Sequence, residues 1–175
     1  MSINTGGVNV GTCLAKSDQN ITVNLFVSGN TEIAAADGTY SKPFRHIAKA
    51  LKYGNEQVAP YNKGTINIYL LNGASIFMSR ENTLYEYRTS SKDQYSFNQE
   101  ILIQPAFCGE TYGDKTFGNS DSDCIASGNT LTVYYQMGND FEFVVPLSLT
   151  IRSIIFDATD SVLVPSESCL FQYSQ

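Results

Sequence analysis

The chain has 175 residues, 42% of them hydrophobic, which is enough for one domain with a substantial core. Its net charge is −6 and it holds only 11 Lys and Arg residues, so it lacks a basic stripe for phosphates and nucleic-acid binding is disfavoured. No apolar run approaches the roughly 18 to 20 residues of a membrane-spanning helix, and the first residues lack the basic start and apolar centre of a secretory signal.

The first 20 residues are rich in Gly, Ser and Asn and show little periodicity. They predict a flexible N-terminal arm, with the folded domain over residues 21–175. The β pattern begins with the apolar run 23–27, and a loop containing Gly, Asn and Asp then leads to the segment 37–44.

A short helix is predicted over residues 42–53. Ser41 offers a capping hydroxyl, Pro43 suits a first turn, and Gly54 can adopt the left-handed conformation that ends a helix. One apolar stripe recurs at helical spacing and is expected to pack against strands; it contains Phe44, Ile47, Ala48 and Leu51.

Most of the remaining chain reads as short strands separated by Gly, Asn, Asp or Pro, and several of them alternate apolar and polar residues. This pattern favours an all-β body. The expected strands are residues 65–71, 74–78, 84–88, 100–105, 130–135, 141–145, 147–152 and 154–156.

The four cysteines permit three disulfide pairings, and the absence of a C-x-x-C pair disfavours a zinc site. Cys108 and Cys124 flank a loop of small polar residues, where a bridge would stabilise the fold by roughly 3 kcal/mol. The pairing of Cys13 and Cys169 stays open, with isolated buried thiols as the alternative. The glycosylation sequon at Asn20 fits a secreted protein, although such triplets also arise by chance.

Two segments carry a resemblance to a known family: Leu25-Phe26-Val27-Ser28-Gly29-Asn30, and the stretch from Asp37-Gly38-Thr39 through Lys42-Pro43-Phe44 to Leu51. Together they resemble the N-terminal capping region of right-handed parallel β-helix proteins of the pectin-lyase-like superfamily. The run from Ile66 to Gly73 is similar to the strand that follows this cap. The region from Leu149 to Asp157 looks like a later coil.

The resemblance implies a right-handed parallel β-helix with one N-terminal capping α-helix, with the cap over residues 23–54 and the coils over 64–175. The chain is then expected to be a fragment of a longer coil. The helix would plug the mouth of the stack and shield its interior. The expected interior ladder is Val23, Leu25, Val27, Ile66, Ile68, Leu70, Ile101, Ile103, Leu149, Ile151 and Phe156.

Hydrolases of this superfamily use clustered Asp carboxylates, and acid–base hydrolysis requires two carboxyl groups at a defined separation. The suggestive set here is Asp157 and Asp160, three residues apart just after a strand, with Arg152 nearby. Such Asp pairs also occur as solvated turn formers. The hydrolase signatures with Asp-Asp and Gly-His-Gly are absent from this sequence.

Lyases of this fold are expected to need Ca²⁺ or a set of Asp ligands, together with an Arg or Lys base. Asp114, Asp121 and Asp123 share one loop and offer oxygen ligands, but their spacing matches no calcium loop and also fits a polar surface loop. His46, expected within the helix, suits a helix or surface position better than the role of a base. We predict no metal and no cofactor.

The sequence is rich in Tyr, and exposed Tyr side chains stack on sugar rings while their hydroxyls bond to sugar hydroxyls. The candidates for carbohydrate contact are Tyr85, Tyr87, Tyr134 and Tyr135. The alternative is that these side chains flank the core with their hydroxyls in water.

The leading interpretation is a non-catalytic extracellular or cell-surface module with a structural, adhesive or carbohydrate-contacting role, without a signal peptide in this chain. Its expected partners are a polysaccharide or glycan, assembly partners, or downstream coils of the same chain. One alternative is a polysaccharide lyase or glycoside hydrolase whose active site lies in later coils, and another is an intracellular assembly subunit. A flat Tyr, Thr and Asn face would favour binding, converging Asp, Arg and Lys would favour the enzyme, and free thiols would favour the intracellular subunit.

Overall fold

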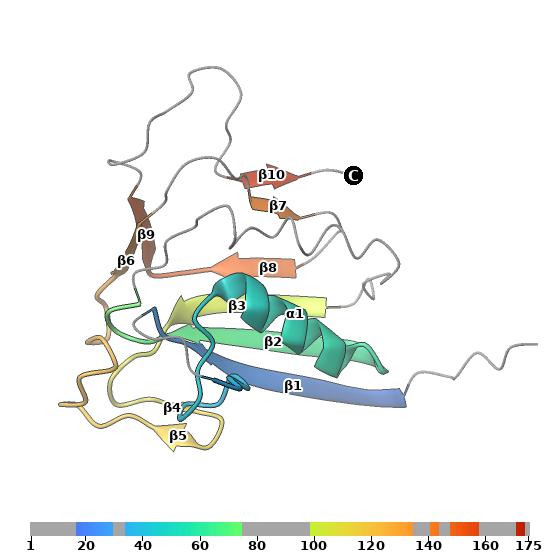
Figure 1. The fold of residues 1–175 in the computed structure, drawn as a ribbon, viewed down its shortest axis with the longest axis horizontal. Helices are drawn as coiled ribbons and strands as arrows, with labels where there is room; N and C mark the ends of the chain where they lie inside the picture. The colour runs from blue at the N-terminus through green and yellow to red at the C-terminus, as the bar shows by residue number, and fades with distance from the viewer. Residues whose placement is uncertain are drawn as a thin grey trace, which may run out of the picture.

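The computed structural model describes residues 17–29, 34–74, 99–134, 141–143, 148–157 and 171–173. Within these ranges the protein is mostly strand with one short helix, so it belongs to the all-β class, as expected (Figure 1). The elements are β1 (Ser17–Val27), α1 (Ile47–Val58), β2 (Tyr61–Leu70), β3 (Gln99–Pro105), β4 (Thr111–Tyr112), β5 (Lys115–Thr116), β6 (Leu131–Tyr134), β7 (Phe141–Phe143), β8 (Ser148–Ile151), β9 (Ile154–Asp157) and β10 (Phe171–Tyr173).

The main sheet has the strand order β1-β2-β3-β8, and every neighbouring pair is parallel. In its register, aliphatic residues of neighbouring strands lie side by side: Leu25 lies beside Ile68, Ile68 beside Ile103, and Ile103 beside Ile151. The predicted interior ladder is therefore confirmed for every member except Phe156, whose side chain lies outside the described residues. Strand alternation places Thr22, Asn24 and Phe26 of β1 on the other face of the sheet, beside Thr65, Asn67 and Tyr69 of β2.

Two smaller parallel sheets repeat the chain order of the strands. After β3 come β6 and β7, and after β8 come β9 and β10; β3 pairs with β8, β6 with β9, and β7 with β10. Figure 1 shows β6 and β9 running across the direction of the main-sheet strands. Between β8 and β9 the chain turns at Ser153, whose φ is 57°, and the Ser153 carbonyl accepts a 2.9 Å hydrogen bond from Leu131 N–H.

The helix boundaries differ from the prediction of residues 42–53. Helix α1 begins at Ile47 and ends at Val58, and its N-cap residue is His46, which makes no side-chain capping bond. Ser41 is therefore not the cap. The reason is that the backbone of Phe44 pairs with the end of β1. Phe44 N–H bonds to the Phe26 carbonyl at 2.9 Å, and Ser28 N–H bonds to the Phe44 carbonyl at 2.8 Å.

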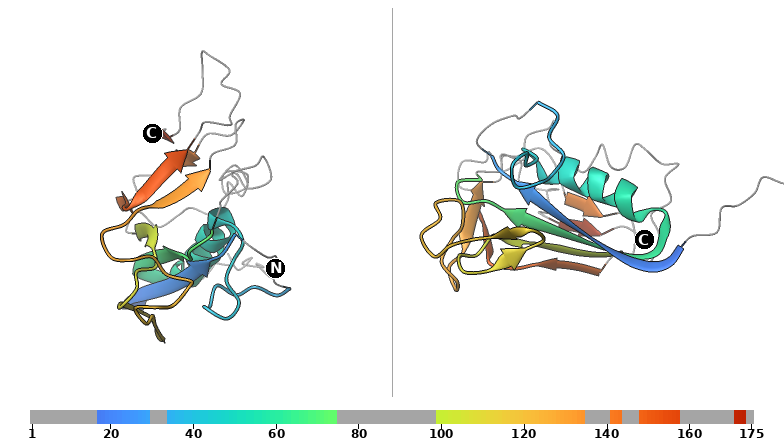
Figure 2. Two further views of the ribbon diagram at one scale, coloured as in Figure 1. Left: turned by 90° about the vertical axis from the view of Figure 1, so that its left-hand side faces the viewer. Right: turned by 90° about the horizontal axis from the view of Figure 1, so that it is seen from below.

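Gly54 lies within α1 rather than after it. The helix packs on the inner face of the main sheet (Figure 2). A Cβ at this position would lie 2.7 Å from Ile66 Cγ2 and 3.2 Å from Leu25 Cδ1. Glycine thus allows the close approach. The helix covers the ladder with Ile47, Ala50, Leu51 and Val58, all buried in the main core.

Residues 37–44, which we call the edge strap, cover the C-terminal half of β1 along the edge of the sheet. Gly38 accepts a 2.8 Å hydrogen bond from Phe26 N–H through its carbonyl, and its φ of +81° suits glycine. A Cβ on Gly38 would lie 2.6 Å from both Leu25 Cδ2 and Phe44 Cε2. A covered edge leaves fewer backbone groups open to a foreign strand.

Two further expectations are modified or fall outside the described residues. Strand β1 begins at Ser17, so the last residues of the predicted arm belong to a strand. The expected strand over 84–88, nearly all of the one over 74–78, and Cys13 and Cys169 lie outside the described residues. Within the described part of the chain, no helix has the length and apolar character needed to cross a membrane.

Candidate functional site: the outward face of the main sheet

The outward face of the main sheet is rich in hydroxyl and amide side chains. Thr22 of β1 lies beside Thr65 of β2, and Asn24 lies beside Asn67 in the next row. Glu100, Leu102, Ser148 and Thr150 continue these two rows across β3 and β8. All of these side chains are partly or fully exposed. We call this polar surface the open face.

The amides of the open face are held in place by hydrogen bonds. Asn24 Oδ1 accepts one bond from Asn67 Nδ2 at 2.9 Å and another from the Tyr69 hydroxyl at 3.2 Å. Fixed amides bind a ligand without losing further side-chain freedom, so this row is preorganised. At the end of the face nearest β8, the exposed side chain of Arg152 donates to Gln104 Oε1.

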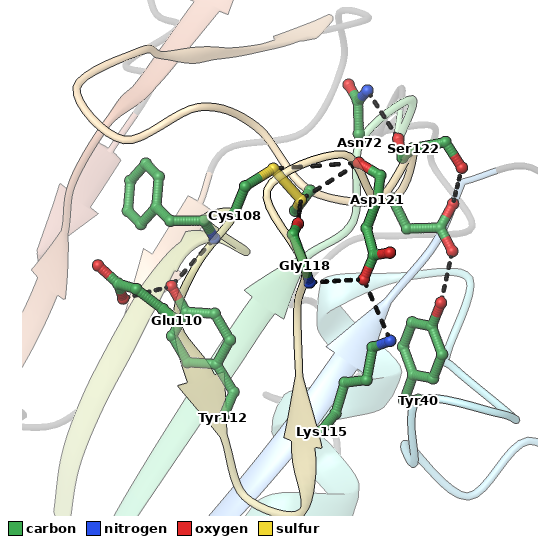
Figure 3. Close-up of a disulfide and its surroundings, with 12 residues drawn as sticks. Tyr40, Asn72, Cys108, Glu110, Tyr112, Lys115, Gly118, Asp121 and Ser122 are labelled. Atoms are coloured by element: carbon green, nitrogen blue, oxygen red, sulfur yellow. Dashed lines mark hydrogen bonds and ion pairs between the residues drawn. A yellow bond between two sulfur atoms is a disulfide. The ribbon is translucent and has the colours of Figure 1, made fainter.

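The rest of the outward surface is covered by residues 107–125, which we call the disulfide loop. The predicted bridge between Cys108 and Cys124 is present, with a Cα–Cα distance of 5.2 Å (Figure 3). The two ends of the loop lie side by side: Cys108 N–H bonds to the Ile125 carbonyl, and Ile125 N–H bonds to the Ala106 carbonyl, both at 2.9 Å.

Beneath the disulfide loop lies a second apolar cluster, separate from the main core. It consists of Phe26, Tyr69, Leu71, Ala106, Tyr112, Phe117 and Cys124. The rings of Tyr69 and Tyr112 stack with their centroids 4.1 Å apart. This cluster closes one end of the open face with buried aromatic rings.

A clamp of polar contacts joins the disulfide loop to the edge strap. The Tyr40 hydroxyl donates a 2.7 Å hydrogen bond to Asp123 Oδ2, which, together with burial, raises the pKa of Tyr40 to about 12. Lys115 Nζ lies 4.3 Å from the centroid of the Tyr40 ring and 4.8 Å from that of Phe117. Cation–π attraction of this kind contributes about 0.5–1 kcal/mol at exposed sites.

The carboxylates of the disulfide loop are engaged in structural bonds. Asp121 accepts from Gly118 N–H at 2.9 Å and pairs with Lys115 at 3.4 Å, and these contacts, the Gly118 bond first, lower the pKa of Asp121. Glu110 Oε2 accepts a 2.7 Å bond from the Tyr112 hydroxyl. Burial above all, and then this bond, raises the pKa of Tyr112.

The proposed calcium ligands do not gather around one point. Asp121 is turned to Gly118 and Lys115, whereas Asp123 is turned to Tyr40 (Figure 3). Asp114 is exposed on the β4–β5 hairpin. Among the described residues, no group of three or more His, Cys, Asp and Glu side chains could hold a metal ion.

The catalytic candidates lie on different sheets. Asp157 is the last residue of β9 in the second sheet, whereas the Arg152 side chain is bonded to Gln104 of the main sheet. Asp160 lies outside the described residues. His46 precedes α1 instead of lying within it.

None of the tyrosines selected from the sequence has a described side chain. Tyr85, Tyr87 and Tyr135 lie outside the described residues, and Tyr134 is placed in β6 with its side chain undescribed. The structure instead places Tyr69 and Tyr112 at the border of the face, each only 5% exposed. The strand alternation that puts Asn67 and Tyr69 on one face is the signal that could have identified Tyr69.

Searches against protein-family models, curated proteins and solved structures find no match to this chain.

Proposed function

We propose that this chain is a non-catalytic extracellular or cell-surface module, built on a short capped parallel β-helix, that contacts a polysaccharide or glycan through its open face. The observation that carries the proposal is the pair of rows, Thr22 beside Thr65 and Asn24 beside Asn67, on the adjacent parallel strands β1 and β2.

The β-helix part of the proposal is supported by the repeated strand order. Strands β3, β6 and β7 pair in parallel with β8, β9 and β10 in the same order, and apolar residues stack in register between them. A chain that winds in one direction produces such a pattern, because each turn lays one strand on each sheet. The left-handed residue Ser153 provides the sharp corner between two sheets, and α1 with the edge strap supplies the cap.

The binding part is supported by the chemistry of the open face. Thr22 and Thr65 offer hydroxyls, and Asn24 and Asn67 offer amides, at the spacing of the adjacent strands β1 and β2, which is about 4.8 Å. Thr150 adds a hydroxyl on β8, on the far side of β3. Neutral donors and acceptors in ordered rows suit a chain of sugar hydroxyls, and on β3 these rows also contain Glu100 and Leu102. The buried Tyr69 and Tyr112 rings stiffen the border of the face rather than stacking on a ligand.

The extracellular part is supported by the Cys108–Cys124 disulfide, because disulfides persist in oxidising compartments. The same bond argues against the intracellular subunit, for which four free thiols were the expected sign. The enzyme is the second candidate, because the Arg152 side chain is bonded to the amide of Gln104.

The test is binding of purified protein to a panel of neutral and acidic polysaccharides, measured by calorimetry. Thr150→Arg places a long cation on the open face, and we expect it to weaken binding about tenfold or more, equivalent to about 1.4 kcal/mol. Thr130→Arg is the matched control at an exposed position outside the strands. Equal affinity of both variants would contradict the assignment of the face, and shortening of the polysaccharide would establish the enzyme instead.

A further inference from the structure

The sequon Asn20-Ile21-Thr22 lies within strand β1. Asn20 and Thr22 are both exposed, whereas Ile21 is partly buried and packs against the main core. Because side chains alternate along a strand, the acceptor amide and the hydroxyl two residues later stand on the same outward side. The two polar members of the triplet are therefore free of the core.

The surroundings of Asn20 leave room for a large substituent. In the register, Asn20 lies beside Lys63, whose side chain is 51% exposed and pairs with the equally exposed Glu100 at 3.3 Å. The disulfide loop covers β1 at Phe26 and reaches Asn24 through Gly113, four residues from Asn20, which corresponds to about 13 Å of strand. The covered and uncovered ends of β1 are thus well separated.

The disulfide supplies a second, independent observation. A structural bond between Cys108 and Cys124 indicates passage through an oxidising compartment, and in eukaryotic secretion that compartment is where sequons are glycosylated. An exposed sequon in a disulfide-bonded chain is a stronger indication than the triplet alone.

We propose that Asn20 carries an N-linked glycan when the chain is secreted from a eukaryotic cell. This inference rests on the extracellular location in the proposed function. In the reaction, Nδ2 of Asn20 loses a proton and forms a bond to C1 of the first sugar. The bond from C1 to the diphosphate of a lipid-linked oligosaccharide breaks, and the lipid diphosphate leaves with the bonding electron pair.

A glycan at Asn20 would also protect the part of β1 that the edge strap leaves open. The strap's hydrogen bonds reach β1 at Phe26 and Ser28. A bulky hydrophilic group on the other half of this edge strand hinders pairing with the edge of another molecule. The strap and the glycan would then cover the two halves of the same edge.

The test is secretion of the full chain, fused to a cleavable signal peptide, from cultured animal cells. We expect a peptide N-glycosidase to lower the apparent mass and, in heavy-oxygen water, to leave labelled Asp at position 20 in the peptide spectrum. Asn20→Gln and Thr22→Ala should abolish the change, whereas Thr22→Ser should retain it. Asn129→Gln, at an exposed asparagine outside any sequon, is the matched control.

An unmodified Asn20 in the wild-type chain, whether secreted or retained in the cell, overturns the inference. The proposed binding function is tested separately on enzymatically deglycosylated protein with Thr150→Arg. A negative result in the glycosylation test therefore does not decide the binding test, and the reverse also holds.

Discussion

Tyr40 and Asp123 lie 83 residues apart in the sequence, yet the Tyr40 hydroxyl donates a 2.7 Å hydrogen bond to Asp123 Oδ2. This bond ties the edge strap, which closes one side of the main sheet, to the disulfide loop, which covers its outward surface. Lys115 reinforces the contact by lying over the Tyr40 ring and pairing with Asp121. The two coverings of the sheet therefore support each other.

Replacement of Tyr40 by Phe should lower the free energy of unfolding by about 1 kcal/mol, since it removes a hydrogen bond to a carboxylate while keeping the ring. Equilibrium unfolding in urea measures the change. Tyr61→Phe, at a partly exposed tyrosine at the start of β2, is the control and should have little effect. Equal losses in both variants would contradict a specific role for the clamp.

The clamp should also make stability depend on alkaline pH. The folded-state pKa of Tyr40 is about 12, above the ordinary value of 10.0, because the protonated phenol donates to Asp123. A raised pKa means that the contribution is fully present below pH 10 and is lost as the pH rises through 12. Unfolding curves between pH 10 and 12 should show a steeper decline in stability for the wild type than for Tyr40→Phe. Parallel curves would sink this prediction.

Removal of the disulfide by the double change Cys108→Ser and Cys124→Ser should cost about 3 kcal/mol, because the bridge closes a loop with a sequence separation of 16. The free energy of unfolding of the wild type, measured in urea, should fall by a similar amount in reductant, whereas that of the double variant should not respond. A reductant effect that persists in the double variant would show that another bond is responsible.

Gly54→Ala distinguishes the observed helix from the predicted one. In an exposed helix interior this change is stabilising by roughly 0.5–1 kcal/mol, but here the new methyl would lie 2.7 Å from Ile66 Cγ2. We expect a net destabilisation of about 1–3 kcal/mol from overpacking, measured by thermal unfolding. Gly118→Ala, where the nearest atom to the new Cβ is Asp121 Oδ1 at 3.5 Å, should be nearly neutral; a stabilised Gly54→Ala protein would contradict the packing.

The sequence predicted the parts of the fold that depend on local patterns. Alternation of apolar residues in runs such as 66–70 was enough to identify the interior ladder, because one residue in two must face the core. The loop composition between Cys108 and Cys124 correctly indicated the bridge. These signals are short in range and act within single elements.

The helix start and the aromatic cluster were not predicted, because both depend on distant contacts. The segment at Ser41 and Pro43 has the residues of a helix N-terminus, yet the edge of β1 takes the backbone of Phe44 into extended pairing. Tyr40 and Lys115 look like ordinary surface residues until the fold places them together. No local sequence pattern indicates this contact.

The edge strap makes the two sides of the main sheet unequal. On the β1 side, residues 37–44 occupy hydrogen-bonding groups of Phe26 and Ser28, whereas β8, at the opposite border of the sheet, is described with one neighbouring strand, β3. A strand added by protein design ahead of β1 would therefore have to displace Phe44 from Phe26 and Ser28, at the cost of the backbone hydrogen bonds that the edge strap makes there.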